Sequence, residues 1–584
     1  MRSVPLSRRA AAATVLLLLA TTGCASLPTS GPVAEGATAT PTSSAAPFDF
    51  NPSGPRPGAS PDEIVDGFLS ALQATPVSTQ VAEEFLTTQA ADVWQPELRT
   101  IVYGSRQISS AGSSVELRIQ DAFELDRRGR WLGRWDEGRL PFRVTEDGGE
   151  WRIEDPPDAM VVPRSHFESR YDTYSLYFLD PSGTVLVPER VYLPRGVQAP
   201  TQLVSGLLAG PVPRAGLVER SYFPEGTKLD VGVPVGPDGV ARVPLSEQVL
   251  DLDEEDLGLA AAQLGWTLGQ LPDVEAFQIT VDGNPVELPE GGAVVDVDAF
   301  GSLDPAVATA SRDLFGLQGR KVVQVVGEEQ VLATRIPKPV AASWGPARWL
   351  GVDMASQQFA MVGRQGSRVL VLGRTEERDV RSAYVGTDVL RPLWDHLGNL
   401  WLVDRTAEGS RVVVTHPGRD RVLQRWPLRG GAVRAAALSR DGSRLVVAQD
   451  EASGFRLRVF RVARDGSGRP VGLTRPIELT PTPGLRHPVR LGWRDPTTVA
   501  VMTRPTATTT RLVLVPADGA TDLAGFEPPV DTLFDRGVSL AASPGGPMAL
   551  NVAVRSGQIH ALNAAGRWEL DAVDAGIREP TFVG

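Results

Sequence analysis

The sequence predicts a multidomain protein in which two α+β domains are followed by an all-β propeller. A chain of 584 residues has room for several domains at roughly 100–200 residues each. Helical apolar spacing gives way to strand patterns twice in the first half, and short apolar strands recur at similar intervals in the second half. The expected segments are a signal peptide at 1–23, a flexible linker at 24–60, a cone-like α+β domain at 61–165, a second α+β domain at 170–300 and the propeller at 315–584.

The N-terminus has the pattern of a lipoprotein export signal. Three arginines precede an apolar run at 10–20, which is shorter than the roughly 20 residues that a permanent membrane helix needs. Small residues then lead to Cys24, the only cysteine of the chain. The segment resembles a bacterial lipobox, although Thr21 stands where leucine is usual, and this resemblance implies a lipid on Cys24. An ordinary secretory signal is the alternative, and the choice between general and twin-arginine export stays open.

Composition indicates an unfolded segment after the signal, and net charge limits the kinds of molecule that the protein can bind. Residues 25–60 are rich in Ser, Thr, Pro, Gly and Ala, and such a segment buries too little apolar surface to fold. The net charge of −12 argues against a nucleic-acid partner, because neutralising phosphates requires a basic surface. An acidic body also does not bind an anionic membrane by itself, so we expect the lipid on Cys24 to hold the protein at the extracytoplasmic face of the cell membrane.

The first folded domain is predicted to begin with a helix. Ser60 and Pro61 stand at the positions that favour a helix start, and two acidic residues follow. Apolar residues then recur at helical spacing, and from about Val115 the pattern becomes that of strands. Four tryptophans are candidates for a ligand pocket, with packing in the core as the favoured interpretation: Trp94, Trp131, Trp135 and Trp151.

The second domain combines strands at 174–179 and 184–187 with helices that begin at Pro200 and near Leu257. The segments 176–179, 186–190, 207–211 and 223–229 resemble a GerMN domain, a module of bacterial spore-germination and envelope proteins. With the lipobox, the opening helix and the β-rich second half, the whole order resembles the LpqB lipoprotein family of high-GC Gram-positive bacteria.

The last region contains an internal repeat. Five apolar strands begin at residues 359, 400, 445, 499 and 548, which are 41, 45, 54 and 49 residues apart. A period in the forties with several strands in each copy is typical of propeller blades. We expect five clear copies, with a strand at 322–326 that closes the ring together with the C-terminal blade. A β-sandwich is the alternative, but it does not require periodic copies.

The sequence offers little catalytic chemistry. It contains no Gly-x-Ser-x-Gly elbow, zinc-protease helix motif or phosphate-binding loop, and a single cysteine excludes an internal disulfide. The acidic segments 251–256 and 296–298 lack the residues that a calcium loop needs. Acidic residues near the blade turns are candidates for a channel cluster, with hydrogen bonding inside each turn as the favoured interpretation: Asp353, Asp395, Asp404, Asp441 and Asp495.

These observations predict a non-enzymatic binding protein without cofactor or metal. The LpqB resemblance implies a partner: the extracytoplasmic domain of an MtrB-like sensor histidine kinase, whose two-component signalling in envelope maintenance and division would be modulated. Two alternatives stay open. One is a binding module for peptidoglycan or another cell-wall polymer, and the other is a propeller hydrolase with converging carboxylates.

Overall fold

The computed structural model describes residues 50–584 with some gaps. The gaps are 213–215, 290, 308–309, 327–328, 375–379, 417–421, 453, 480–487, 522, 524–529, 543–549, 564 and 571–575. The predicted signal peptide and Cys24 therefore lie outside the described residues. Within the described residues, no helix is both long and apolar enough to cross a membrane.

The first module begins with helix α2, Pro61–Ala71, as the sequence predicts. The backbone amide and the hydroxyl of Ser60 both donate to the Glu63 carboxylate, at 2.8 and 2.7 Å, and so form one half of a capping box. Phe68 on the inner face of the helix is fully buried. Burial of a phenylalanine side chain contributes about 1.5–3 kcal/mol, so this face fixes the helix against the sheet.

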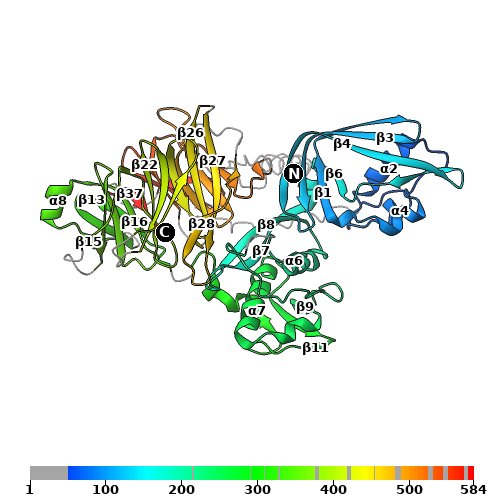
Figure 1. Ribbon diagram of the computed structural model, residues 1–584, viewed down its shortest axis with the longest axis horizontal. Coiled ribbons are helices and arrows are strands. Elements are labelled where there is room, and N and C mark those ends of the chain that lie inside the picture. The colour runs from blue at the N-terminus through cyan, green and yellow to red at the C-terminus, as the bar shows by residue number, and fades with distance from the viewer. Residues whose placement is uncertain are drawn as a thin grey trace, which may run out of the picture. The chain divides into compact units, whose positions relative to one another are not determined.

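The sheet of the first module begins earlier than the predicted position near Val115. Its order is β5-β4-β3-β1-β6, with β2 paired to β3, and α2 contacts β2, β3 and β5 (Figure 1). The remaining bounds are α3 Gln80–Glu83, α4 Thr88–Val93, η1 Pro96–Leu98, β1 Arg99–Tyr103, β2 Ser105–Ala111, β3 Ser114–Asp126, β4 Trp131–Asp147, β5 Glu150–Asp155, β6 Met160–Pro163 and α5 Arg164–Arg170.

The last part of the predicted flexible linker is bound to this module. The backbone amide of Thr75 donates to the Phe50 carbonyl at 2.9 Å, and the amide of Phe50 donates back at 3.2 Å. The amide of Gly58 donates to the Glu150 carboxylate at 2.8 Å. The expectation of a linker that is free up to residue 60 is therefore wrong for this part, because backbone pairing is not visible in composition.

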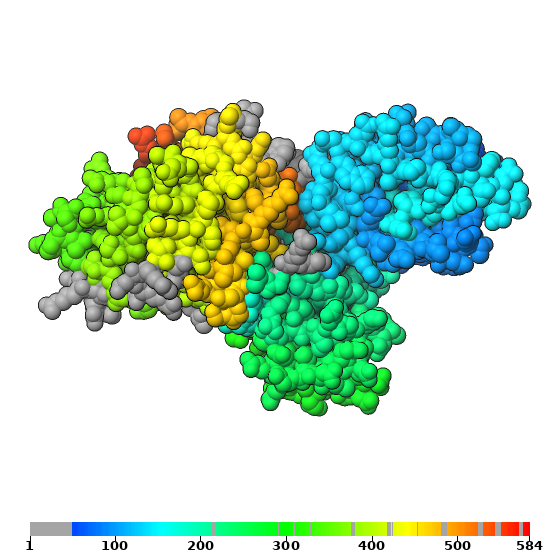
Figure 2. All heavy atoms as spheres, viewed as in Figure 1, coloured from blue at the N-terminus to red at the C-terminus, as the bar shows by residue number. Residues whose placement is uncertain are grey.

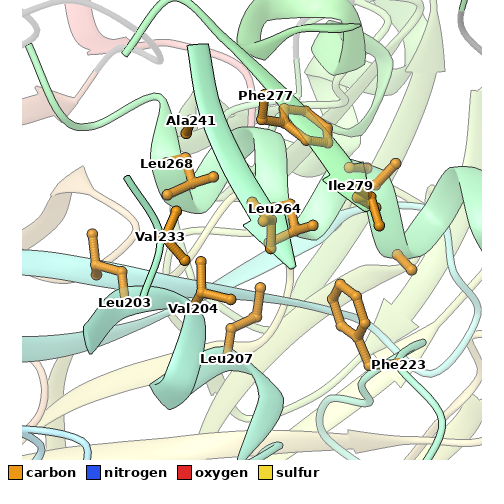
Figure 3. Packing of buried hydrophobic residues seen from close by; sticks show 14 of the residues in the cluster. Leu203, Val204, Leu207, Phe223, Val233, Ala241, Leu264, Leu268, Phe277 and Ile279 are labelled. Carbon is orange, nitrogen blue, oxygen red and sulfur yellow. The ribbon is translucent and has the colours of Figure 1, made fainter. Parts of the chain in front are cut away.

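The second module packs two helices against short strands around one core. Leu203, Val204 and Leu207 of α6 share one core with Leu264 and Leu268 of α7, and Phe277 of β10 belongs to the same core (Figure 3). The bounds are β7 Tyr171–Leu179, β8 Leu186–Pro194, α6 Ala199–Leu208, β9 Val240–Pro244, η2 Glu247–Asp251, α7 Glu254–Leu268, β10 Ala276–Val281, β11 Asn284–Pro285, β12 Val295–Asp296 and η3 Val297–Leu303.

The described part of the third module is a ring of six sheets, which we number as blades 1 to 6. Blade 1 has the order β15-β14-β13-β37, and blades 2 to 6 contain β16 to β19, β20 to β24, β25 to β29, β30 to β32 and β33 to β36. Their atoms run from green to red in Figure 2. The propeller prediction is confirmed. The predicted strand at 322–326 belongs to blade 1, where β13 lies between it and the C-terminal strand β37 (Figure 1).

Apart from β37, the strands of blades 1 to 3 follow one another along the chain, with helix α8 between the first two blades. Their bounds are β13 Leu314–Gln318, β14 Lys321–Val326, β15 Glu329–Arg335, α8 Lys338–Trp344, β16 Ala347–Val352, β17 Gln358–Gly363, β18 Arg368–Gly373, β19 Val380–Val385, β20 Asp388–Val389, β21 Leu393–Trp394, β22 Leu400–Thr406, β23 Gly409–Thr415 and β24 Val422–Leu428.

Blades 4 to 6 and the closing strand complete the ring. Their bounds are β25 Val433–Leu438, β26 Arg444–Glu451, β27 Gly454–Arg464, β28 Pro470–Leu473, β29 Ile477–Glu478, β30 Pro488–Asp495, β31 Thr498–Thr503, β32 Arg511–Pro516, β33 Gly537–Ala542, β34 Leu550–Val554, β35 Ile559–Leu562, β36 Trp568–Leu570 and β37 Arg578–Thr581. The predicted repeat strands are β17, β22, β26, β31 and β34; the last begins at Leu550, and the two residues before it lie outside the described residues.

Candidate functional site

Six inner strands surround the propeller axis, and arginines gather where these strands begin. The inner strands contact one another in the order β37, β16, β21, β25, β30, β33 and back to β37. The arginines come from blades that are far apart in the sequence. We call the following set the arginine mouth: Arg348 on β16, Arg391 before β21, Arg490 on β30, Arg504 after β31 and Arg536 before β33.

Trp349 and Glu579 lie within this cluster. The guanidinium groups of Arg490 and Arg348 are 4.7 and 5.3 Å from the centre of the Trp349 ring, which is cation–π distance. Arg391 donates to the carbonyl oxygens of Leu540 at 3.1 Å and Pro580 at 2.8 Å, while the nearest Glu579 oxygen is 3.9 Å away. Arg348 is also paired with Asp388 at 2.9 Å. The five guanidinium groups of the cluster thus outnumber the carboxylates of Asp388 and Glu579 that are placed to neutralise them.

Burial and neighbouring charges shift the pKa values of these side chains. Burial lowers the pKa of Arg490 to about 10, and Arg391 and Arg504 add to that lowering. Burial also lowers the pKa of Arg504, with Arg536 as the second cause. Burial raises the pKa of Glu579, although its arginine neighbours oppose that rise. An anionic partner would relieve this excess of positive charge.

An exposed aromatic side chain extends the arginine mouth. Phe534 is 86% exposed and stands two residues before Arg536. Its loop is held to blade 5, because the Thr510 hydroxyl donates to the Asp535 carbonyl at 2.7 Å. Exposed aromatic and arginine side chains are the residue types that contribute most of the binding energy in protein interfaces. This surface therefore combines the residue types that favour binding to an acidic protein surface.

A second cluster connects the second module to the propeller. We call Glu189, Glu219, Arg444 and Arg461 the junction network. Arg444 donates to Glu189 at 2.6 Å, and Arg461 donates both to Glu189 and, at 2.6 Å, to Glu219. Nearby, the backbone amide of Arg464 donates to the Leu217 carbonyl at 2.6 Å. Buried charges with several hydrogen bonds fix one docking geometry between the two modules.

The two glutamates of the junction network differ in their proton affinity. Burial raises the pKa of Glu219 to about 7, and the charge of Glu189 adds to that rise. Burial acts in the same sense on Glu189, but Arg461 and Arg444 outweigh it and lower the pKa of Glu189. The pair therefore holds a proton on Glu219 near neutral pH, while Glu189 carries the negative charge.

A cavity of about 330 Å³ lies beside the junction network. Its wall includes Trp131 of the first module, Arg190 of the second module and Thr497 of the propeller. The Arg190 guanidinium donates to the Thr498 hydroxyl at 2.9 Å. Of the four predicted pocket tryptophans, Trp131 alone lines this cavity.

The other three tryptophans pack in the core, as the favoured interpretation predicts. The ring centre of Trp94 lies 5.4 Å from that of Phe68, and its indole nitrogen donates to the Pro157 carbonyl at 2.8 Å. Trp135 and Trp151 are partly buried against the same core.

Most of the five predicted aspartates accept hydrogen bonds within their own turns. Backbone amides of the same turn donate to each of four carboxylates, namely those of Asp353, Asp395, Asp441 and Asp495. Asp404 differs, because it lies within β22 and accepts from the Thr387 amide at 2.9 Å and the Tyr384 hydroxyl at 2.8 Å. None of these five, all within the described part of the chain, lines the channel cavity between the inner strands.

The acidic segment at 251–256 is the start of a helix, as the sequence favours. Asp253 is the N-cap of α7, and its side chain accepts from the Asp256 amide at 2.9 Å. The segment at 296–298 joins β12 to η3. Among the residues that the structure describes, no group of three or more His, Cys, Asp and Glu side chains is placed to hold a metal ion.

Sequence reasoning missed both charged clusters. Glu189 and Arg190 belong to a segment that carries the GerMN resemblance, but the sequence does not name their partners, because Arg461 is 272 residues beyond Glu189. A signal was nevertheless present. Adjacent charged residues in the otherwise apolar strand β8 favour a buried polar contact, since a charge in such a strand requires a partner.

The order of modules defines a multidomain protein with an N-terminal α+β domain, a GerMN domain and a β-propeller. The chain matches the families "Lipoprotein LpqB, N-terminal domain" at residues 54–168, "Sporulation and spore germination" at 175–287 and "Lipoprotein LpqB beta-propeller domain" at 321–533. It is 30% identical over 488 residues to Lipoprotein LpqB of Mycobacterium bovis, covering 74% of this chain and 77% of the relative. The chain belongs to the LpqB lipoprotein family.

Other comparisons agree with this assignment or concern one module. Lipoprotein LpqB of Thermobifida fusca is 28% identical over 496 residues, which is 78% of each chain. Among solved structures, the first GerMN domain of the sporulation protein GerM from Bacillus subtilis is 24% identical and covers 21% of this chain and 93% of that domain, with a TM-score of 0.18.

Proposed function

We propose that this lipoprotein is anchored through Cys24 at the extracytoplasmic face of the cell membrane and binds the extracytoplasmic domain of an MtrB-like sensor histidine kinase. In this proposal the arginine mouth is the contact surface, and the bound lipoprotein modulates two-component signalling in envelope maintenance and division. The LpqB resemblance supplies the partner. The arginine mouth supports it, because a surface with an excess of positive charge on a protein of net charge −12 favours an acidic protein surface.

The proposed mechanism is a shift in the population of kinase states. A lipoprotein that binds one conformation of the sensor more tightly raises the population of that conformation. A tenfold preference corresponds to about 1.4 kcal/mol, which is a small fraction of the energy available from one well-packed interface. No bond needs to be made or broken for this effect.

The test is site-specific photocrosslinking in native membranes. The full chain carries a photoreactive phenylalanine at Phe534, which is 86% exposed, or at Val197, which is 87% exposed and lies in the second module. We expect the sensor kinase to be captured from position 534 and not from position 197. Equal capture of the kinase from both positions, or consistent capture of wall polymer from position 534, would contradict the proposal.

Charge reversal tests the contact itself. Arg504→Glu with Arg536→Glu should abolish capture from position 534, because both guanidinium groups belong to the arginine mouth. The matched control is Arg118→Glu, whose side chain is 47% exposed and is paired with Glu116 on the first module. Capture that survives the double reversal, or is lost equally in the control, would exclude the arginine mouth as the contact.

A further inference from the structure

A small cavity inside the propeller has two guanidinium groups on an otherwise apolar wall. It encloses about 70 Å³, and Arg391 and Arg440 both line it. The rest of the wall includes Leu393, Trp493 and Phe582. The low polarity of such a wall strengthens any electrostatic interaction inside the cavity and makes an unpaired charge costly.

The guanidinium group of Arg440 has unusually few polar neighbours for a charged side chain. Its guanidinium nitrogens have only two weak neighbours, the Met354 sulfur at 3.9 Å and the Ala542 carbonyl at 3.5 Å. Within the described residues, Arg440 takes part in no ion pair at 4.0 Å or less. The carboxylate of Gly584, which lines the same cavity, does not pair with it at that distance either. Burial alone lowers the pKa of Arg440 to about 9, with no opposing carboxylate.

Arg391 brings a second cation to the same space. Two of its nitrogens donate to backbone carbonyls, and its Nε is buried without a hydrogen-bond partner. Burial lowers the pKa of Arg391 as well, and Glu579 only partly opposes that. Two incompletely paired guanidinium groups on one apolar cavity form a site of net positive charge.

We propose that this channel cavity binds one small oxyanion, with the phosphate ion as its probe, between Arg391 and Arg440. The planar fork of a guanidinium matches the oxygens of an oxyanion, and such charge-assisted hydrogen bonds are stronger than neutral ones. The cavity volume of about 70 Å³ exceeds the roughly 10–15 Å³ of accessible space that one buried water needs, so a single small ion has room in it.

This site overlaps the proposed kinase contact at Arg391, which belongs to the arginine mouth, whereas Arg440 lines the cavity and is not part of that surface. Arg440→Gln therefore separates the two proposals, because it should weaken phosphate binding and leave kinase capture from position 534 in place. Failure of kinase capture would in turn leave phosphate binding in place.

The test is calorimetric titration of the full chain in detergent with inorganic phosphate. We expect saturable binding of one phosphate for each chain. Arg440→Gln and Arg391→Gln should each weaken that binding at least tenfold, while Arg118→Gln leaves it unchanged. Unsaturable uptake, or equal binding by all three variants, would mean an adventitious ion only and would overturn the proposal.

Melting temperatures with and without phosphate distinguish loss of binding from poor folding of a variant. Without phosphate, Arg440→Gln should melt at or above the temperature of the natural chain, because it removes an uncompensated charge. Phosphate should raise the melting temperature of the natural chain and leave that of the variant unchanged. A variant that melts lower without phosphate, and still responds to it, would show that Arg440 has a structural partner and that the anion binds elsewhere.

Discussion

Replacing Arg461 by methionine should loosen the contact between the second module and the propeller. Within the described residues, the change leaves Glu189 paired with Arg444 alone and removes the one arginine that donates to Glu219. Removing one partner of a buried ion pair costs about 3–5 kcal/mol. At about 1.4 kcal/mol for each factor of ten, the fraction of molecules with this contact open should rise a hundredfold or more at pH 7.5.

Hydrogen exchange at the junction measures this change. The Arg464 amide crosses from the propeller to the second module at 2.6 Å, so peptides that contain it report opening of the contact. The control is Arg434→Met, because Arg434 is 53% exposed and its pair with Asp450 lies on the surface; exposed pairs contribute about 0–1 kcal/mol. The same exchange rate at Arg464 in both variants would refute the reasoning.

The pH dependence gives a second check on the same network. The folded pKa of Glu219 is raised from 4.5 to about 7, so its contribution to docking is fully present below pH 4.5 and is lost as the pH rises through 7. We therefore expect a larger protection factor at Arg464, which is exchange slowed relative to the intrinsic rate at the same pH, at pH 5.5 than at pH 8. Adding Glu219→Gln to Arg461→Met should restore most of the protection at pH 7.5, and a double variant that opens as readily as the single one would contradict this account.

Three further predictions concern single residues. Cys24→Ser should move the protein from the membrane fraction to the aqueous fraction, and unchanged fractionation would exclude the lipid anchor. Ser60→Ala should lower the stability of the first module by about 1 kcal/mol in urea unfolding, because it removes the hydroxyl that donates to Glu63, whereas a change on α2's exposed face should have little effect. Asp395→Ala should cost about 3–5 kcal/mol, because Arg464 then loses a buried partner at 2.9 Å, and Asp395→Asn should cost less; equal losses would mean that the charge is unimportant.

The sequence predicted those parts of the fold that depend on local patterns. The opening helix was predictable because Ser60, Pro61 and Glu63 act within one turn, and the repeat strands were predictable because each is a short apolar run after a turn. The early start of the first sheet at Arg99 was missed, because β1 is short and its partner β6 is about 60 residues away.

The charged clusters could not be predicted because their members are brought together only by the ring. Arg348 and Arg490 stand in different blades, and each one alone resembles a solvated arginine at the start of a strand. Their common neighbour Trp349 becomes informative only once the inner strands are placed around one axis. Pairing over such separations depends on tertiary structure rather than on residue type.

Closure of the ring by β37 sets an order on biosynthesis. Strand β13 pairs with β14 beside it in the chain, but it cannot pair with β37 until residues 578–581 have been synthesised, some 260 residues later. Bringing ends that far apart together costs about 5 kcal/mol of chain entropy, so earlier blades wait as an open arc with unsatisfied edges. A fusion partner attached directly behind Thr581 would therefore obstruct the pairing that completes the ring.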